Sequence, residues 1–207
     1  MGAPGLTSPI RSEAFQKLQL NAGIFLEGFD HSSVTDAAGL KTAIAAAISS
    51  GTNIFGVTRG GGTFIVTKER RTPEVDGLRY PFKGQDFIDS IDGYLSGTLL
   101  EVTPKNVERL MAQADVTTSG KKTTITMHTA TDTSTDYLSK LAWVGDLADG
   151  QLVLIELDNA YNEADFSLTF ADKNEGTMPF EFHARQSDVL DYDTAPFRVI
   201  FFDKAST

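Results

Sequence analysis

The sequence predicts a mainly β protein, a β-sandwich or partial barrel with one or two α-helices packed on it. One reason is the composition: 18 Gly and 14 Phe, with many Thr and Val, are typical of pleated sheets and of the turns between them. Another is that short stretches of alternating apolar and polar residues recur between turn signals. The third is a hydrophobic fraction of 41%, which is enough for a core and excludes a disordered chain.

The chain is expected to form one domain preceded by a short arm. Residues 1–14 mix Gly, Pro, Ser and Thr without periodicity, which predicts a flexible N-terminal arm. Residues 15–207 are then a single β-sandwich domain. Its first strand is expected from Leu18 to Phe29, where apolar residues occupy alternate positions.

A first helix is predicted over residues 36–49, where apolar residues recur at four-residue spacing among alanines. Thr35 or Asp36 can cap its start, and Gly51 can close its end. This change from period two to period four separates the helix from the strands on either side.

A second helix is predicted over residues 104–114. Thr103 followed by Pro104 pairs a helix cap with a proline at the first helical position. The apolar residues that follow, Val107, Leu110, Met111 and Ala114, lie at i, i+3, i+4 and i+7. They form one stripe, which should pack on a sheet.

The remaining apolar stretches predict strands separated by turn signals such as Asp149-Gly150, Glu175-Gly176 and Ala195-Pro196. The expected strand regions are 53–67, 94–102, 123–129, 141–147, 152–157, 165–170, 180–185 and 197–202. With the first strand, the chain is expected to hold about nine or ten strands.

A glycine triplet, Gly60-Gly61-Gly62, interrupts the first of these regions, so a strand, a glycine-rich kink or turn, and another strand are expected over 53–67. A phosphate-binding loop needs Gly-Lys followed by Ser or Thr at the start of a helix, whereas Thr63 and Phe64 here open a strand. We therefore expect Gly60, Gly61 and Gly62 to permit a kink or bulge and a tight backbone approach, within the chain or at a crowded subunit contact.

Residues 68–92 are polar and rich in turn signals, which predicts a long loop or an extended hairpin. Long loops without structure of their own are uncommon in compact domains and usually have a function. This segment is therefore the predicted contact loop. Its candidate contact residues are Arg70, Arg71, Asp76, Arg79 and Lys83.

No pattern in the sequence predicts catalysis, a cofactor or a metal. The chain has no cysteine, and His31, His128 and His183 lie far apart without metal-ligand spacing. Two groups of acids, Asp86, Asp89 and Asp92, and Asp188, Asp191 and Asp193, lack the order of a calcium loop. No serine lies in a Gly-x-Ser-x-Gly motif either. We expect no catalytic residue, no metal, no cofactor and no enzyme.

The charge argues against a surface that grips nucleic acid. The net charge is −10, and residues 104–207 hold 9 basic and 17 acidic side chains against 9 and 11 in residues 1–103. Phosphate contacts need clustered Lys and Arg. No apolar run approaches the roughly 20 residues that cross a bilayer, and the first residues lack the order of a signal peptide. We therefore expect a soluble protein, cytoplasmic when made, without a membrane partner.

The aromatic residues allow two interpretations. Trp143 and the phenylalanines of the second half are expected mostly in the core, and a face that stacks sugars or bases is the alternative. Phe201 and Phe202 are adjacent, so one of the two must point away from the face that the other joins.

An ordered set of segments resembles a known family. The segments are Asn21-Ala22-Gly23-Ile24, Gly56 to Phe64, Glu74-Val75-Asp76-Gly77, Thr98 to Thr103, Trp143 to Leu147, Gly150 to Asn159, Pro179 to His183 and Pro196 to Asp203. Together they are similar to the tail tube, or major tail, proteins of long-tailed bacteriophages. The Thr-rich stretch 117–136 has no counterpart in that resemblance.

The resemblance implies a β-sandwich that assembles as hexameric rings, stacked into a virion tube through which DNA passes without specific binding. It also implies an N-terminal arm and a long hairpin loop that contact the next ring, which correspond by position to residues 1–14 and 68–92. Expected partners are other copies of the chain and the tape measure, tail terminator and tail-tip proteins. The protein is expected in the phage tail, and in the bacterial host cytoplasm during assembly.

Two alternatives remain open at this stage. A tail-completion or tail-tip protein of the same fold would form one ring rather than a tube. A carbohydrate-binding or hydrolytic β-sandwich would use the aromatic residues, Trp143 above all, and the acidic residues.

Overall fold

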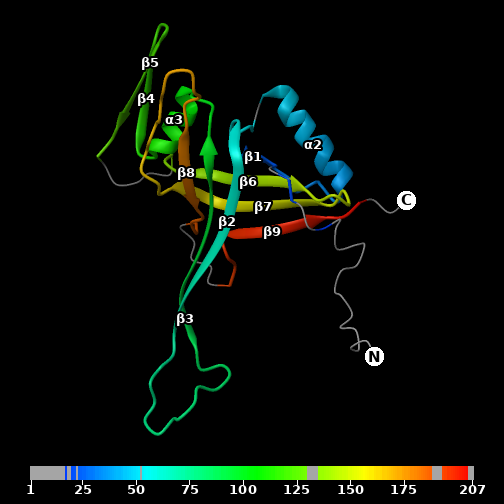
Figure 1. Cartoon of the computed structure of the whole chain (residues 1–207), viewed down its shortest axis with the longest axis vertical. Helices are drawn as coiled ribbons and strands as arrows, with labels where there is room; N and C mark the ends of the chain where they lie inside the picture. The colour runs from blue at the N-terminus through cyan, green and yellow to red at the C-terminus, as the bar shows by residue number, and fades with distance from the viewer. Residues whose placement is uncertain are drawn as a thin grey trace, which may run out of the picture.

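The structure is a computed structural model, and it describes residues 17, 20, 21, 23–51, 53–129, 135–187 and 193–204. Within these residues the chain is mainly β, as predicted, with nine strands and two helices (Figure 1). The predicted arm, residues 1–14, and two of the acids, Asp188 and Asp191, lie outside the described residues. The elements are β1 (Ile24–Glu27), α2 (Ala37–Ser50), β2 (Thr58–Arg71), β3 (Phe87–Leu99), α3 (Pro104–Met111), β4 (Ala114–Ser119), β5 (Lys122–Met127), β6 (Leu138–Asp146), β7 (Leu152–Asn162), β8 (Met178–His183) and β9 (Phe197–Phe202).

Seven strands form one large antiparallel sheet that bends along β7. The order is β1-β6-β7-β8-β3-β2, and β9 pairs with β7 as a branch. The first part of β7 pairs with β6 and β9, whereas only Tyr161 and Asn162, at its end, pair with β8. The change of partner follows Asn159, whose φ of 46° is a left-handed conformation that asparagine tolerates better than most residues. The bend turns the two parts of the sheet toward each other.

The main core lies between these two parts. Phe25 of β1 meets Phe180 of β8 edge to face, with ring centroids 5.2 Å apart, and Phe55 packs on Phe180 and Phe182. Such aromatic pairs add to the free energy gained by burying their area. Most of the other fully buried side chains of this core are leucines of β3, β6, β7 and α3.

The strands β6 and β7 are buried on both faces. Leu141, Trp143 and Ile155 point toward the main core, while the alternating residues Val144 and Leu154 point to the other face. Helix α2 covers that second face and buries Leu40 there (Figure 1). This explains why both strands are near-continuous apolar runs rather than alternating sequences.

Both predicted helices are confirmed, with their caps. Asp36 accepts a hydrogen bond from the backbone N–H of Gly39 at 2.7 Å, and Gly51 is left-handed with φ of 64°. Thr103 accepts from the N–H of Asn106 at 3.2 Å. The second helix ends at Met111 rather than 114, because Ala112 has a positive φ of 54° and the chain then enters β4.

Helix α3 is held to the sheet by buried polar residues as well as by its apolar stripe. Arg109 pairs with Glu27 of β1, lies over the ring of Phe55, and donates to the Asn106 side chain at 3.0 Å. Burial lowers the pKa of Arg109 to about 10. Asn162 of β7 donates to the carbonyl oxygen of Leu110 at 2.8 Å. Sequence periodicity showed only the apolar part of this contact.

Several predicted strands differ from the observed ones. The first strand is short, Ile24–Glu27, and it ends before Gly28, which has a positive φ of 59°. Residues 165–170 form only an isolated bridge, Thr169 to Thr177, because the alternation there is not matched by a neighbouring strand. The Thr-rich stretch 117–136 begins within a separate two-stranded hairpin, which β4 and β5 form apart from the large sheet.

Of residues 53–67, only those from Thr58 onward form a strand, and Ile54 before them makes an isolated bridge with Leu26, so the two predicted strands are one. Strand β2 begins at Thr58 and continues through the glycines. The register shifts between Thr58 and Gly62, which is a bulge, because Gly60 and Gly61 take φ of 76° and 75°.

Candidate functional site

The most prominent surface feature is the hairpin of β2 and β3, which reaches away from the rest of the molecule (Figure 1). Residues 68–71 and 87–92, predicted as loop, belong to its paired strands, so the loop itself is 72–86. The predicted segment is thus an extended hairpin, the second of the two forms expected. A hairpin keeps the long segment ordered because its backbone groups are paired.

Apolar side chains are exposed at this end of the hairpin. Tyr80 is 82% and Phe82 is 62% exposed, and Val75 and Leu78 are exposed beside them. Phe87, Ile88 and Ile91 continue the exposed apolar residues along β3. We call residues 70–84 the hairpin tip. Large apolar side chains exposed together in one segment indicate a candidate site of interaction.

The loop is held by its own hydrogen bonds. Gln85 is buried, although its neighbours are exposed. Its side chain donates to the carbonyl oxygen of Pro73 at 2.9 Å and accepts from the N–H of Phe82 at 3.2 Å. Thr72 donates to Asp86 at 2.6 Å across the base of the loop. Tyr80 and Phe82 are therefore presented by a loop with internal hydrogen bonds. No pattern in the sequence predicts the role of Gln85.

The five charged residues predicted as contacts all lie on the hairpin tip and are exposed; they are Arg70, Arg71, Asp76, Arg79 and Lys83. Arg71 already has a partner within the chain: its side chain lies 3.3 Å from Asp89 and over the ring of Phe87. The tip holds four basic and two acidic side chains, whereas the rest of the chain holds 14 and 26. The tip is therefore positive on a negative molecule.

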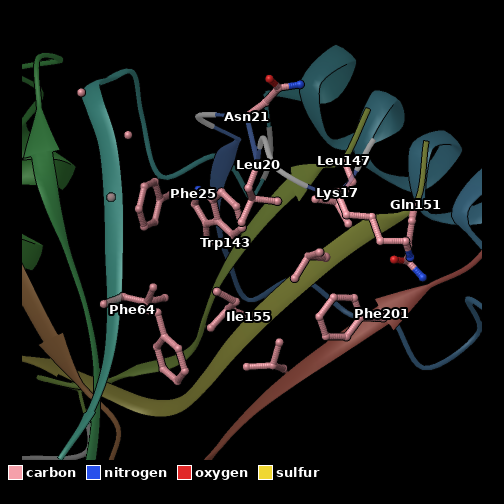
Figure 2. A pocket seen from close by; sticks show the side chains of 16 residues that line it. Lys17, Leu20, Asn21, Phe25, Phe64, Trp143, Leu147, Gln151, Ile155 and Phe201 are labelled. Atoms are coloured by element: carbon pink, nitrogen blue, oxygen red, sulfur yellow. The ribbon is translucent and has the colours of Figure 1, made fainter. Parts of the chain in front are cut away.

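A second feature is an apolar hollow of about 940 Å³ between the two parts of the bent sheet. Figure 2 shows Phe64, Trp143, Ile155 and Phe201, from β2, β6, β7 and β9, around this space. Among the described strands, β2 pairs only with β3, and β9 only with β7, so each leaves one edge unpaired. Phe201 is 59% exposed at the hollow.

The glycine triplet forms part of the wall of this hollow. A side chain at Gly62 would place its Cβ 2.7 Å from Phe25 and 2.8 Å from the carbonyl oxygen of Ser96, whereas at Gly60 nothing lies within 4 Å. At Gly62, therefore, Phe25 and the backbone of Ser96 approach the main chain too closely to leave room for a side chain. Gly60 and Gly61 instead supply the left-handed backbone of the bulge.

The adjacent aromatics Phe201 and Phe202 point to opposite faces of β9, as the period of a strand requires. Phe202 is buried in the cluster under α2, and Phe201 lines the hollow. Trp143 is only 7% exposed and belongs to the main core, while one side of it lines the hollow. It does not form a flat exposed platform for a sugar ring.

The polar clusters are ion-pair networks. Around His183, Nδ1 lies 2.7 Å from Asp92 and Nε2 lies 3.1 Å from Glu181, and the ring stacks on Tyr94. Arg185 pairs with Glu163 and with Asp92. In the described part of the chain no group of three or more acids, histidines or cysteines has metal-site geometry.

The other two histidines and the acids Asp86, Asp89 and Asp92 do not come together in one site. His31 pairs with Glu156, and His128 lies between Asp115 and Asp136. Asp86, Asp89 and Asp92 contact three different partners, Thr72, Arg71 and His183.

No family model matches the chain, and no curated protein matches it. No helix in the described residues is long and apolar enough to span a membrane.

Proposed function

We propose that this chain is a structural, self-assembling protein, the tail tube subunit of a long-tailed bacteriophage. In this proposal the bent sheet is a partial barrel, six copies form a ring, and stacked rings form the conduit through which DNA is ejected. The protein has no catalytic residue and no cofactor. Its location is the virion, and the host cytoplasm during assembly.

The observation that carries the proposal is the hairpin tip. An ordered projection exposes Tyr80 and Phe82 to water, at a cost that burial against a partner removes. The tip is positive while the remainder of the chain is strongly negative, so another copy of the same chain offers a complementary surface. A contact between two different surfaces of identical chains repeats without limit unless it closes on itself.

Two further features support the same proposal. The ordered resemblance of segments such as Gly56 to Phe64 and Trp143 to Leu147 points to tail tube proteins. The excess of acidic residues suits a bore that repels phosphate groups, so that DNA slides instead of binding. Tape measure, tail terminator and tail-tip proteins are the expected further partners.

The test is electron microscopy of the purified chain over a range of concentrations. Rings and tubes wide enough for duplex DNA are expected. A chain that stays monomeric in sedimentation at the highest concentration, and that does not add to purified phage tails, would refute the proposal.

A deletion then asks whether the hairpin tip is the contact. Replacing residues 72–84 by a short glycine linker removes Tyr80 and Phe82 but leaves the main core intact. The variant should keep its circular dichroism spectrum and melting temperature, yet form no tube. Loss of the folded state on deletion would instead make the segment part of the domain core.

A further inference from the structure

The hollow between β2 and β9 has the lining of a binding site. Its floor is apolar and already packed, with Phe25, Trp143 and Ile155 belonging to the main core. Its mouth carries Phe201 and Leu20, which are about half exposed. An apolar site of several hundred cubic ångströms with few polar groups favours an apolar or aromatic occupant.

The wall formed by the glycines suits an occupant that comes close to the backbone. Gly60 has no side chain and nothing within 4 Å of the position that a Cβ would take. An aromatic ring from outside can therefore lie against the main chain of the bulge.

The polar groups at the rim are bonded to acids. Asn21 donates to Asp146 at 2.7 Å, Gln151 donates to Asp203, and Lys17 lies 3.5 Å from Asp149. Among the described residues, Lys17 is the one charged side chain that lines the hollow itself. The three carboxylates lie just outside the lining, against Asn21, Gln151 and Lys17, and Lys204 lies beside Gly150. Together these charges make the surroundings of the hollow slightly negative, which fits a basic partner better than an acidic one.

The chain itself carries a segment of matching chemistry, the hairpin tip with Tyr80 and Phe82 among basic residues. It cannot fill the hollow of its own copy. Gly62 lines the hollow and Arg71 ends the same strand, so nine residues at about 3.3 Å each place the tip roughly 30 Å away. A tip from another copy has no such restriction.

We infer that the hollow between β2 and β9 is the acceptor site for the hairpin tip of a second copy, which inserts Tyr80 and Phe82 there. The inference rests on the proposed self-assembly and names the surface that receives the hairpin. The donor and acceptor surfaces differ, so the contact is head to tail and leaves a free tip and a free hollow at the ends of any open chain of copies.

Because the chain has no cysteine, thiol crosslinking will report only on cysteines that are introduced. One chain carries Tyr80→Cys and the other Phe201→Cys; the two are mixed, allowed to assemble, and treated with an oxidant or a short bismaleimide. Val199→Cys, on the same strand and lining the same hollow, is a second acceptor that leaves Phe201 in place. The matched control is Phe170→Cys, since Phe170 is 83% exposed and does not line the hollow.

A covalent dimer of donor with either acceptor is expected, and no dimer of donor with the control. A chain carrying both Tyr80→Cys and Val199→Cys should give a ladder of multimers, because each copy is donor and acceptor at once. Ser8→Cys in place of Tyr80→Cys reports on the N-terminal segment as a rival occupant.

The outcomes separate the inference from the proposed function. Tubes seen by microscopy without a donor–acceptor crosslink overturn the inference and leave the tube proposal standing. A crosslink to the hollow from Ser8→Cys, with none from Tyr80→Cys, also overturns it. A monomeric protein without any crosslink refutes both.

Discussion

Replacing Tyr80 and Phe82 by serine should weaken assembly strongly without affecting the fold. An aromatic side chain buries about 200 Å² when it is fully covered. With Tyr80 82% and Phe82 62% exposed, roughly 160 and 120 Å² respectively remain to be buried by a partner. At about 25 cal/mol per Å² the pair gives at most about 7 kcal/mol per contact.

Covering half of that area gives about 3.5 kcal/mol, which corresponds to a shift of roughly 300-fold in the concentration needed for assembly. Both side chains are largely exposed in the monomer, so the free energy of unfolding should change by less than about 0.5 kcal/mol each. The double variant should therefore melt like the parent protein while failing to assemble.

The assay is sedimentation and electron microscopy across a dilution series, with thermal melting in parallel. Phe170→Ser is the control, since this side chain is 83% exposed but lies far along the sequence from the hairpin. Assembly of the double variant at the parent's concentration would refute the role of the tip. Equal loss with Phe170→Ser would show that general surface hydrophobicity, rather than the hairpin, drives association.

Three further predictions concern the fold that supports these surfaces. Gly62→Ala forces a methyl group against Phe25 and should lower the free energy of unfolding by about 1–3 kcal/mol in urea titration; no change would mean that the bulge moves freely. Glu156 is fully buried between the cationic side chains of Lys140 and Arg198 and the ring of His31. Glu156→Gln should therefore lower the free energy of unfolding by about 3 kcal/mol in urea titration, the lower end for breaking a buried pair, because the two cations keep access to water. An unchanged free energy of unfolding would show that the charge is not needed. The backbone N–H of Gln151 lowers the pKa of Asp149 below its ordinary value of 3.8, so this carboxylate stabilises the fold above that value and stops doing so as the pH falls through the lower folded pKa. Asp149→Asn should therefore lose less stability than the parent as the pH falls below the ordinary aspartate pKa of 3.8, measured by thermal melting; parallel curves would contradict this.

Local signals in the sequence predicted the helices well. Asp36, Gly51 and Thr103 cap the ends of helices α2 and α3, and capping depends only on residues within one turn of the helix end. The same holds for the split between Phe201 and Phe202, which needs only the period of a strand. By contrast, the alternation at 165–170 gave no strand, because a strand also needs a neighbour to pair with.

The turn-rich composition of residues 68–92 predicted a contact segment, but it did not predict which side chains of the segment are exposed and which are buried. The charged residues were the visible feature of the sequence, whereas the structure shows exposed aromatics and the buried Gln85 that fixes the loop. Exposure depends on where the hairpin points, and nothing within the segment itself determines that.

By itself the sequence determined the mainly β class, both capped helices and the position of the long hairpin, since these follow from short-range periodicity and capping. Only the tertiary structure decided that β7 joins two parts of one bent sheet, that Arg109 of α3 pairs with Glu27 of β1, and that a hollow opens between β2 and β9. These features join residues far apart in the chain, and their positions depend on the packing of the whole core rather than on any local pattern.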